Sequence, residues 1–213
     1  MCYNKDISLY TYVLGLVASF LLLQKKDKDL KIIGCFFLVV IHMQLIEYFL
    51  WINNKCNINN ISLSYLAAIV NFIQPIVLYL ALVYYNKELY LKNKKIVDTI
   101  LIIYIISTII HFINLIPISC TNVTKLSSPY LQWSWLFQDN SIIMALCFPI
   151  TLMLLIYYGL SSPYNLYLAL ICILSFVVSY IIYNKKRAFG TLWCWFAVFI
   201  PIGLLIIDTF YNL

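Results

Sequence analysis

The chain has 213 residues, of which 64% are hydrophobic and 10% are charged, and its formal net charge is +6. Soluble domains carry about one quarter charged residues, whereas about 20 consecutive apolar residues are enough to cross a bilayer. This composition excludes a soluble enzyme or nucleic-acid-binding domain, because membrane topology and lipid headgroups account for the lysines between the apolar segments. We expect one domain over residues 1–213, surrounded by a lipid bilayer and without a nucleic-acid partner.

Seven apolar segments follow one another along the chain, and none of them contains Lys or Arg. Each is close to the length of about 20 residues that a helix needs to cross a bilayer. We therefore predict an all-α fold, namely a polytopic (multi-pass) membrane protein that forms a bundle of seven transmembrane helices. The predicted spans cover residues 7–23, 32–52, 61–85, 96–117, 139–160, 165–183 and 191–211.

The distribution of lysines predicts an orientation. The connections 24–31 and 86–95 contain four lysines each. Because positively charged loops stay in the cytoplasm, the amino terminus is predicted to lie outside and the carboxyl terminus in the cytoplasm. Lys185, Lys186 and Arg187 count against this orientation, since seven crossings place their connection outside.

Two connections on the predicted outer side carry candidate modifications. Cys56 and Cys120 are a candidate disulfide pair if the chain matures in an oxidising compartment, and two free thiols are the alternative in a reducing one. Asn60 and Asn122 begin the tripeptides Asn-Ile-Ser and Asn-Val-Thr, which are candidate glycosylation sites. Such tripeptides also occur by chance in a chain rich in Asn.

The tryptophans fall on one side of the predicted bundle, because seven alternating crossings bring all five to the outer face. An indole ring prefers the headgroup boundary, where its single N–H group is half wetted. We expect a tryptophan belt at this boundary, and an aromatic vestibule around a binding site is the alternative. The residues are Trp51, Trp133, Trp135, Trp193 and Trp195.

Polar side chains within the apolar segments are the main indication of function. A carboxyl group at the centre of a transmembrane helix costs roughly 2.5–3.5 kcal/mol on insertion scales, so Glu47 requires a partner or a wet cavity. In the same segment Gln44 and Trp51 share a helical face with Glu47, and His42 lies beside that face. The next two segments contribute Asn71 with Gln74 and His111 with Asn114, each pair spaced i, i+3.

We predict that Glu47 and His111 lie at the same depth. Each is about fifteen residues from the inner end of its segment, or about 22 Å along a helix. Our hypothesis is that they share a proton at a polar centre, with hydrogen bonds that merely hold helices together as the alternative. The predicted ligand or proton site consists of Gln44, Glu47, His42, Asn71, Gln74, His111 and Asn114.

The second segment carries a short motif, Q-x-x-E-x-x-x-W, formed by Gln44, Glu47 and Trp51, and the third contains Gln74 followed by Pro75. This pattern resembles a group of uncharacterised small multispanning membrane proteins. The resemblance covers about one quarter of the chain, and Tyr48 stands where that group would have Gly. The resemblance supports Glu47 as a site residue and implies no activity.

Three classes of function remain open. The preferred one is a membrane protein, transporter or channel included, that binds or translocates a small solute or a proton through the polar intramembrane site. The alternatives are a membrane-embedded enzyme acting on lipid, and a structural or assembly protein. We favour a non-enzyme without metal or cofactor, because the chain has only two His and no Cys and His spacing suited to zinc. The oligomeric state is left open.

Overall fold

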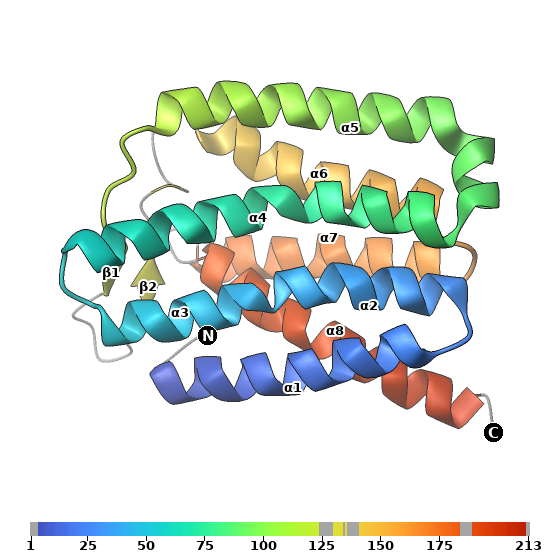
Figure 1. Ribbon diagram of the computed structural model, residues 1–213, viewed down its shortest axis with the longest axis horizontal. Helices are drawn as coiled ribbons and strands as arrows, with labels where there is room; N and C mark the ends of the chain where they lie inside the picture. The colour runs from blue at the N-terminus through green and yellow to red at the C-terminus, as the bar shows by residue number, and fades with distance from the viewer. Residues whose placement is uncertain (1–3, 124–129, 134, 136–140, 184–188, 212–213) are drawn as a thin grey trace.

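The computed structural model describes residues 4–123, 130–133, 135, 141–183 and 189–211. Within them the chain is almost entirely α-helical, with one two-stranded antiparallel hairpin (Figure 1). The elements are α1 (Lys5–Gln24), α2 (Lys28–Val40), α3 (His42–Ile52), α4 (Ile58–Tyr85), α5 (Lys87–Leu115), β1 (Asn122–Val123), β2 (Leu131–Gln132), α6 (Ser141–Gly159), α7 (Tyr164–Tyr183) and α8 (Phe189–Tyr211).

The helices correspond to the seven apolar segments. Across the described residues, six helical units are long and apolar enough to cross a membrane, and the part of α6 from Leu146 to Gly159 is a shorter apolar helix. Helices α2 and α3 count as one unit because only Ile41 separates them. The N–H of Ile41 still donates to the Phe37 carbonyl at 3.0 Å, and its own carbonyl accepts from the N–H of Gln44 at 2.9 Å. The second bond joins residues three positions apart instead of four, so it tightens one turn, and the helix continues from α2 into α3.

The prediction that residues 86–95 form a loop is wrong. Helix α5 begins at Lys87, so its lysines lie on its first turns, and Asn86 alone joins it to α4. Asn86 caps both helices. Its N–H donates to the Leu82 carbonyl of α4 at 3.0 Å, and its side chain accepts from the N–H of Leu89 in α5 at 3.4 Å. Lys is a good helix former, so hydropathy marks the apolar part of this helix and misses its charged start.

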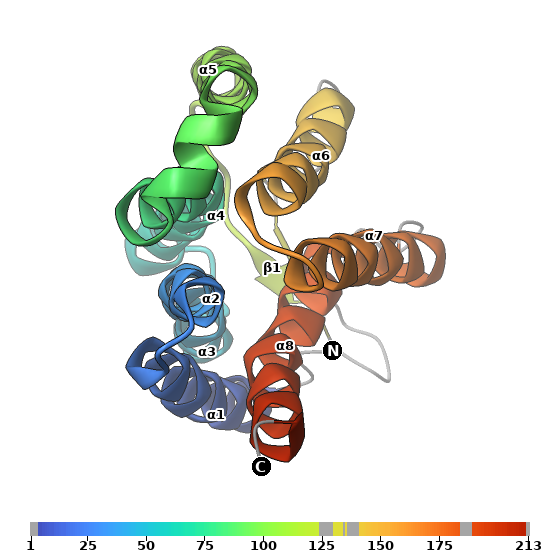
Figure 2. The same ribbon diagram turned by 90° about the vertical axis from the view of Figure 1, so that its right-hand side faces the viewer.

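Successive helices run in alternating directions. Helix α1 begins at the end of the bundle that holds the β-hairpin, and α8 ends at the opposite end (Figure 1). Seen along the bundle, α1, α2 with α3, α4, α6, α7 and α8 surround the interior, while α5 lies outside against α4 and α6 (Figure 2). The segments α4 and α6 also contact each other, as do α2 and α8. The bundle thus has an interior bordered by six helical units and an outer helix that covers one side.

Small residues allow the closest packing between α1 and α2. A Cβ atom on Gly34 would lie 2.8 Å from the carbonyl oxygen of Ser19 and 3.0 Å from the backbone nitrogen of Leu23. Both neighbours are backbone atoms, which cannot move aside as a side chain can. Gly34 therefore permits a backbone contact between these helices, as small residues do at transmembrane helix interfaces.

Candidate functional site

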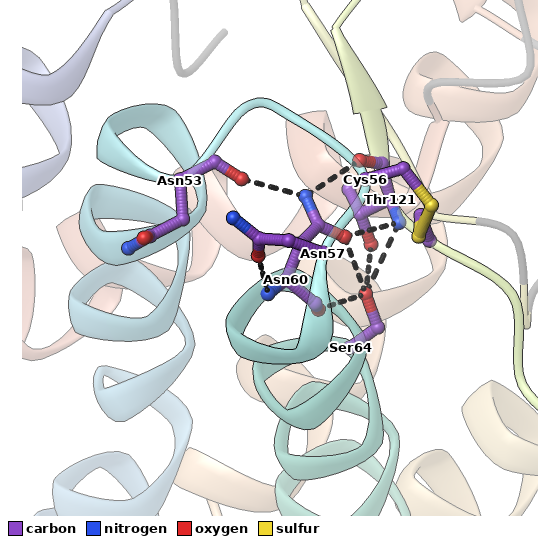
Figure 3. The surroundings of a disulfide bond; sticks show 7 residues. Asn53, Cys56, Asn57, Asn60, Ser64 and Thr121 are labelled. Carbon is purple, nitrogen blue, oxygen red and sulfur yellow. Dashed lines mark hydrogen bonds between the residues drawn. A yellow bond between two sulfur atoms is a disulfide. The ribbon is translucent and has the colours of Figure 1, made fainter.

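The end of the bundle that holds the hairpin is fastened by a disulfide. Cys56, just before α4, is bonded to Cys120, and their Cα atoms are 5.5 Å apart (Figure 3). Asn60 lies beside this disulfide, where its Nδ2 donates to the carbonyls of Asn53 at 2.7 Å and Thr121 at 3.0 Å. In return the N–H of Thr121 donates to Oδ1 of Asn60 at 2.9 Å. The start of α4 and the segment after α5 are thus joined covalently and by paired hydrogen bonds.

This network does not fit glycosylation of Asn60. The residue is 0% exposed, and both hydrogens of its amide nitrogen are used in hydrogen bonds. A glycan on that nitrogen would remove a hydrogen bond and would have no space. Asn122 is exposed on β1, while Thr124 of its tripeptide lies outside the described residues, so its glycosylation stays a prediction.

The connection between α5 and α6 folds into this end of the bundle. Trp133 and Trp135 are only 2% and 0% exposed, and their rings stack with centroids 5.0 Å apart. Trp135 also meets the ring of Phe72 on α4 edge-on at 5.7 Å. The expectation that these two residues form a belt at the headgroup boundary is wrong, because strand β2, directly before them, pairs with β1 and turns them inward.

Glu47 and His111 are placed in different parts of the bundle. Helix α3, which carries Glu47, packs mainly on α1 and α4, whereas α5, which carries His111, packs on α4 and α6. His111 meets the ring of Phe72 edge-on at 5.5 Å. Glu47 is buried and lies near Cys194 of α8. Matched depth along two helices therefore did not bring the two side chains into one pair.

Gln44 joins two helices. Its Oε1 accepts a hydrogen bond from the hydroxyl of Thr11 on α1 at 3.0 Å, in a fully buried contact. Thr11 was not among the predicted site residues, since a hydroxyl in an apolar helix carries no sign of the neighbour that it faces. This contact has the character of a bond that holds helices together.

Two other predicted residues do not face the interior. Asn114 is exposed, and its Nδ2 donates to the Ile110 carbonyl one turn earlier at 2.9 Å. His42 is half-buried, with Nδ1 against the Leu38 carbonyl and its ring edge-on to Tyr12 at 5.6 Å. The i, i+3 spacing of Asn114 and His111 was thus insufficient to identify an inward face, because His111 is buried whereas Asn114 is exposed.

Asn71 and Gln74, on α4, line a cavity in the interior of the bundle. The cavity has a volume of about 60 Å³ and is bordered by α2, α4, α6, α7 and α8. Such a volume exceeds the 10–15 Å³ that one water needs by roughly four-fold. Most of the wall is aliphatic or aromatic, with Phe36, Leu78, Phe148, Ile156 and Leu168 among its members. The lining contains no Asp, Glu, Lys, Arg or His.

Gln74 is a polar residue of the cavity wall with an unsatisfied hydrogen-bond donor. Its side chain is 3% exposed, and its Nε2 has no hydrogen-bond partner among the described residues. Ser175 of α7 and Trp193 of α8, which also line the cavity, satisfy each other, because the indole N–H donates to the Ser175 hydroxyl at 2.9 Å. The Ser175 hydroxyl in turn donates to the Cys172 carbonyl at 3.0 Å. Gln74 therefore places a buried donor without a hydrogen bond in the wall of the cavity.

Asn71 and Gln74 were predicted as site residues, whereas Ser175 and Trp193 on the opposite wall of the cavity were not. Ser175 and Trp193 come from helices far along the chain, and a single hydroxyl or indole in an apolar segment indicates no particular neighbour. In the part of the chain that the structure describes, no three His, Cys, Asp or Glu residues are grouped to hold a metal ion. No protein family, curated protein or solved structure matches this chain.

Proposed function

We propose that the chain is a multi-pass membrane protein that binds a small solute in the cavity beside Asn71 and Gln74. The observation that carries this proposal is the buried Nε2 of Gln74, which lacks a partner within the described residues at the edge of an apolar cavity. A buried amide without a hydrogen bond costs about 1–3 kcal/mol. A ligand or water that accepts this hydrogen bond removes the cost.

The exposed surface supports a place in the bilayer. Helix α5 presents a row of large aliphatic side chains that are more than half exposed, which a soluble surface would not carry as one continuous strip. Lipid chains cover such a strip without cost, since they are as apolar as the side chains. The row consists of Ile102, Ile103, Ile106, Ile109, Ile110 and Ile113.

The disulfide supports the predicted orientation independently of the lysines. Disulfides persist in oxidising compartments, so the end of the bundle with Cys56 and Cys120 belongs outside. The opposite end holds Lys26 and the lysines at the start of α5, which belong in the cytoplasm by the positive-inside rule. Both arguments support a cytoplasmic position for the carboxyl-terminal end of α8.

Solute binding has more support than the two alternatives. An amide that only holds helices together bonds to a neighbouring helix, as Oε1 of Gln44 does with Thr11, whereas Gln74 lines the cavity. A proton shared between Glu47 and His111, or catalysis that uses both, would need the two side chains at one site, whereas their helices pack on different neighbours.

The experiment is an analysis of what the protein retains. Protein purified from its membrane in mild detergent is extracted with organic solvent, and small molecules are measured by mass spectrometry per mole of protein. We expect a molecule to be retained by the native chain and by Asn114→Leu, which alters an exposed amide. Gln74→Leu should retain several-fold less. Equal retention by the two variants, or nothing retained by any of them, would contradict the proposal.

A further inference from the structure

We infer, building on the proposed function, that the solute is a neutral single-chain amphiphile whose oxygen accepts a hydrogen bond from Nε2 of Gln74. The reasons are the shape of the cavity, the position of its polar groups and the lack of charge in its lining. The small solute of the proposed function thus belongs to one chemical class.

The cavity is long and narrow. On α2 its lining runs from Ile33 to Val40, and on α4 from Asn71 to Leu78. On α7 and α8 the lining also extends over an interval of seven residues. This interval corresponds to about 10 Å at about 1.5 Å per residue. A volume of about 60 Å³ over that length fits one extended alkyl chain better than fused rings.

The polar groups of the cavity lie toward one end. Helix α4 runs from the disulfide end toward the lysine-rich end, so Asn71 and then Gln74 precede the apolar Leu78. Helix α7 runs in the opposite direction, from the apolar Leu168 to Ser175. The polar head of the ligand thus points toward the disulfide end, and its chain extends toward the lysine-rich end.

The hydrogen-bonding groups define the head. Gln74 offers an unpaired N–H donor, and Asn71 adds an amide that both donates and accepts. An alcohol, ester or amide oxygen satisfies these groups. A carboxylate or a quaternary ammonium would enter a cavity whose lining carries no opposite charge, and a buried unpaired charge is far more costly than a neutral polar group.

The test uses a medium-chain fatty alcohol, matched to the cavity length of about 10 Å, that carries a diazirine near the end of its chain. The protein in lipid nanodiscs is irradiated with this probe, and the labelled peptides are mapped by mass spectrometry. We expect adducts around Ile156, Leu160 and Leu168, at the apolar end of the cavity. Excess unlabelled alcohol should remove them, whereas the corresponding carboxylate and alkyl trimethylammonium should compete at least ten-fold less well.

Two variants test the contact separately from folding. Gln74→Leu should reduce this labelling about five-fold, as the loss of one neutral hydrogen bond predicts. Ala197→Leu keeps the amide but narrows the cavity, and it should also reduce labelling. Asn114→Leu should label like the native chain. Thermal unfolding of each variant identifies any that fails to fold.

The outcomes separate the two proposals. Equal competition by a charged amphiphile, or labelling of the same peptides by a diazirine sterol, would overturn the neutral single-chain class. In either case the cavity would still be a binding site. Absence of labelling with every probe, together with no retained molecule in the extraction, would overturn the proposed function itself.

Discussion

Oδ2 of Asp29 accepts the backbone N–H of Ser161 at 3.0 Å, across 132 positions of the chain. Its other oxygen accepts from Nδ2 of Asn86 at 3.3 Å, so this one carboxylate joins the starts of α2 and α5 to the α6–α7 connection. Asp29 is only 4% exposed. Lys25 adds an ion pair of 2.7 Å with Asp208 of α8. The lysine-rich end of the bundle is therefore held by Asp29, which hydropathy assigns to a connection, and by Asp208, which it assigns to the end of the seventh span.

Asp29→Ala should destabilise the protein. The substitution leaves the N–H of Ser161 and the amide of Asn86 without their acceptor, which costs about 2 kcal/mol. Unfolding by denaturant in a fixed detergent, followed by circular dichroism, measures the change in midpoint. The matched control is Asp6→Ala, because Asp6 is an exposed acid in the first turn of α1. Equal midpoints for the two variants would show that the Asp29 contacts contribute nothing.

Replacing Cys56 and Cys120 together by Ser should also lower stability. The disulfide closes a loop of 64 residues, for which chain entropy predicts up to about 4 kcal/mol. The effect is expected to be smaller in a bilayer, where the helices of the unfolded chain remain inserted. Thermal unfolding with and without reductant is the measurement. The native chain should lose stability on reduction, whereas the double variant should not respond.

The proposed topology predicts the sides on which engineered cysteines react. Asn122→Cys lies at the disulfide end and Lys26→Cys at the lysine-rich end, and both native residues are exposed. In intact cells a charged maleimide that cannot cross membranes should label the first above the background of the native chain, and the second only after permeabilisation. Labelling of both in intact cells would contradict an odd number of crossings between them.

Gly34→Ala should be destabilising although Ala is the better helix former. The new methyl group would lie 2.8 Å from the Ser19 carbonyl oxygen, so α1 must move, which costs roughly 1–3 kcal/mol for overpacking. Gly203→Ala is the control, because nothing lies within 4 Å of its added Cβ. In the same unfolding assay Gly203→Ala should be neutral or stabilising by about 0.5–1 kcal/mol. A similar response of the two variants would exclude a tight α1–α2 contact.

The amino-acid sequence by itself determined the local structure. Uninterrupted apolar segments favour helices whatever surrounds them, so within the described residues a helical unit lies at each predicted span, although α5 already begins at Lys87. Asn71 and Gln74 share a face of α4 because i, i+3 spacing follows from helix geometry alone, and both line the cavity. Cys56 and Cys120 were identified as a pair because both lie between apolar segments on the same side of an alternating bundle.

Only the tertiary structure decided which faces meet. Glu47 and His111 were predicted to lie at the same depth, yet depth along an axis says nothing about rotation or about which helices are neighbours, and their helices pack on different partners. Trp133 and Asn60 were assigned to the outer boundary, but the connection between α5 and α6 folds inward and buries both. Ser175 and Trp193 complete the cavity from α7 and α8 because packing brings distant segments together, and that packing depends on the shapes of all the helices at once.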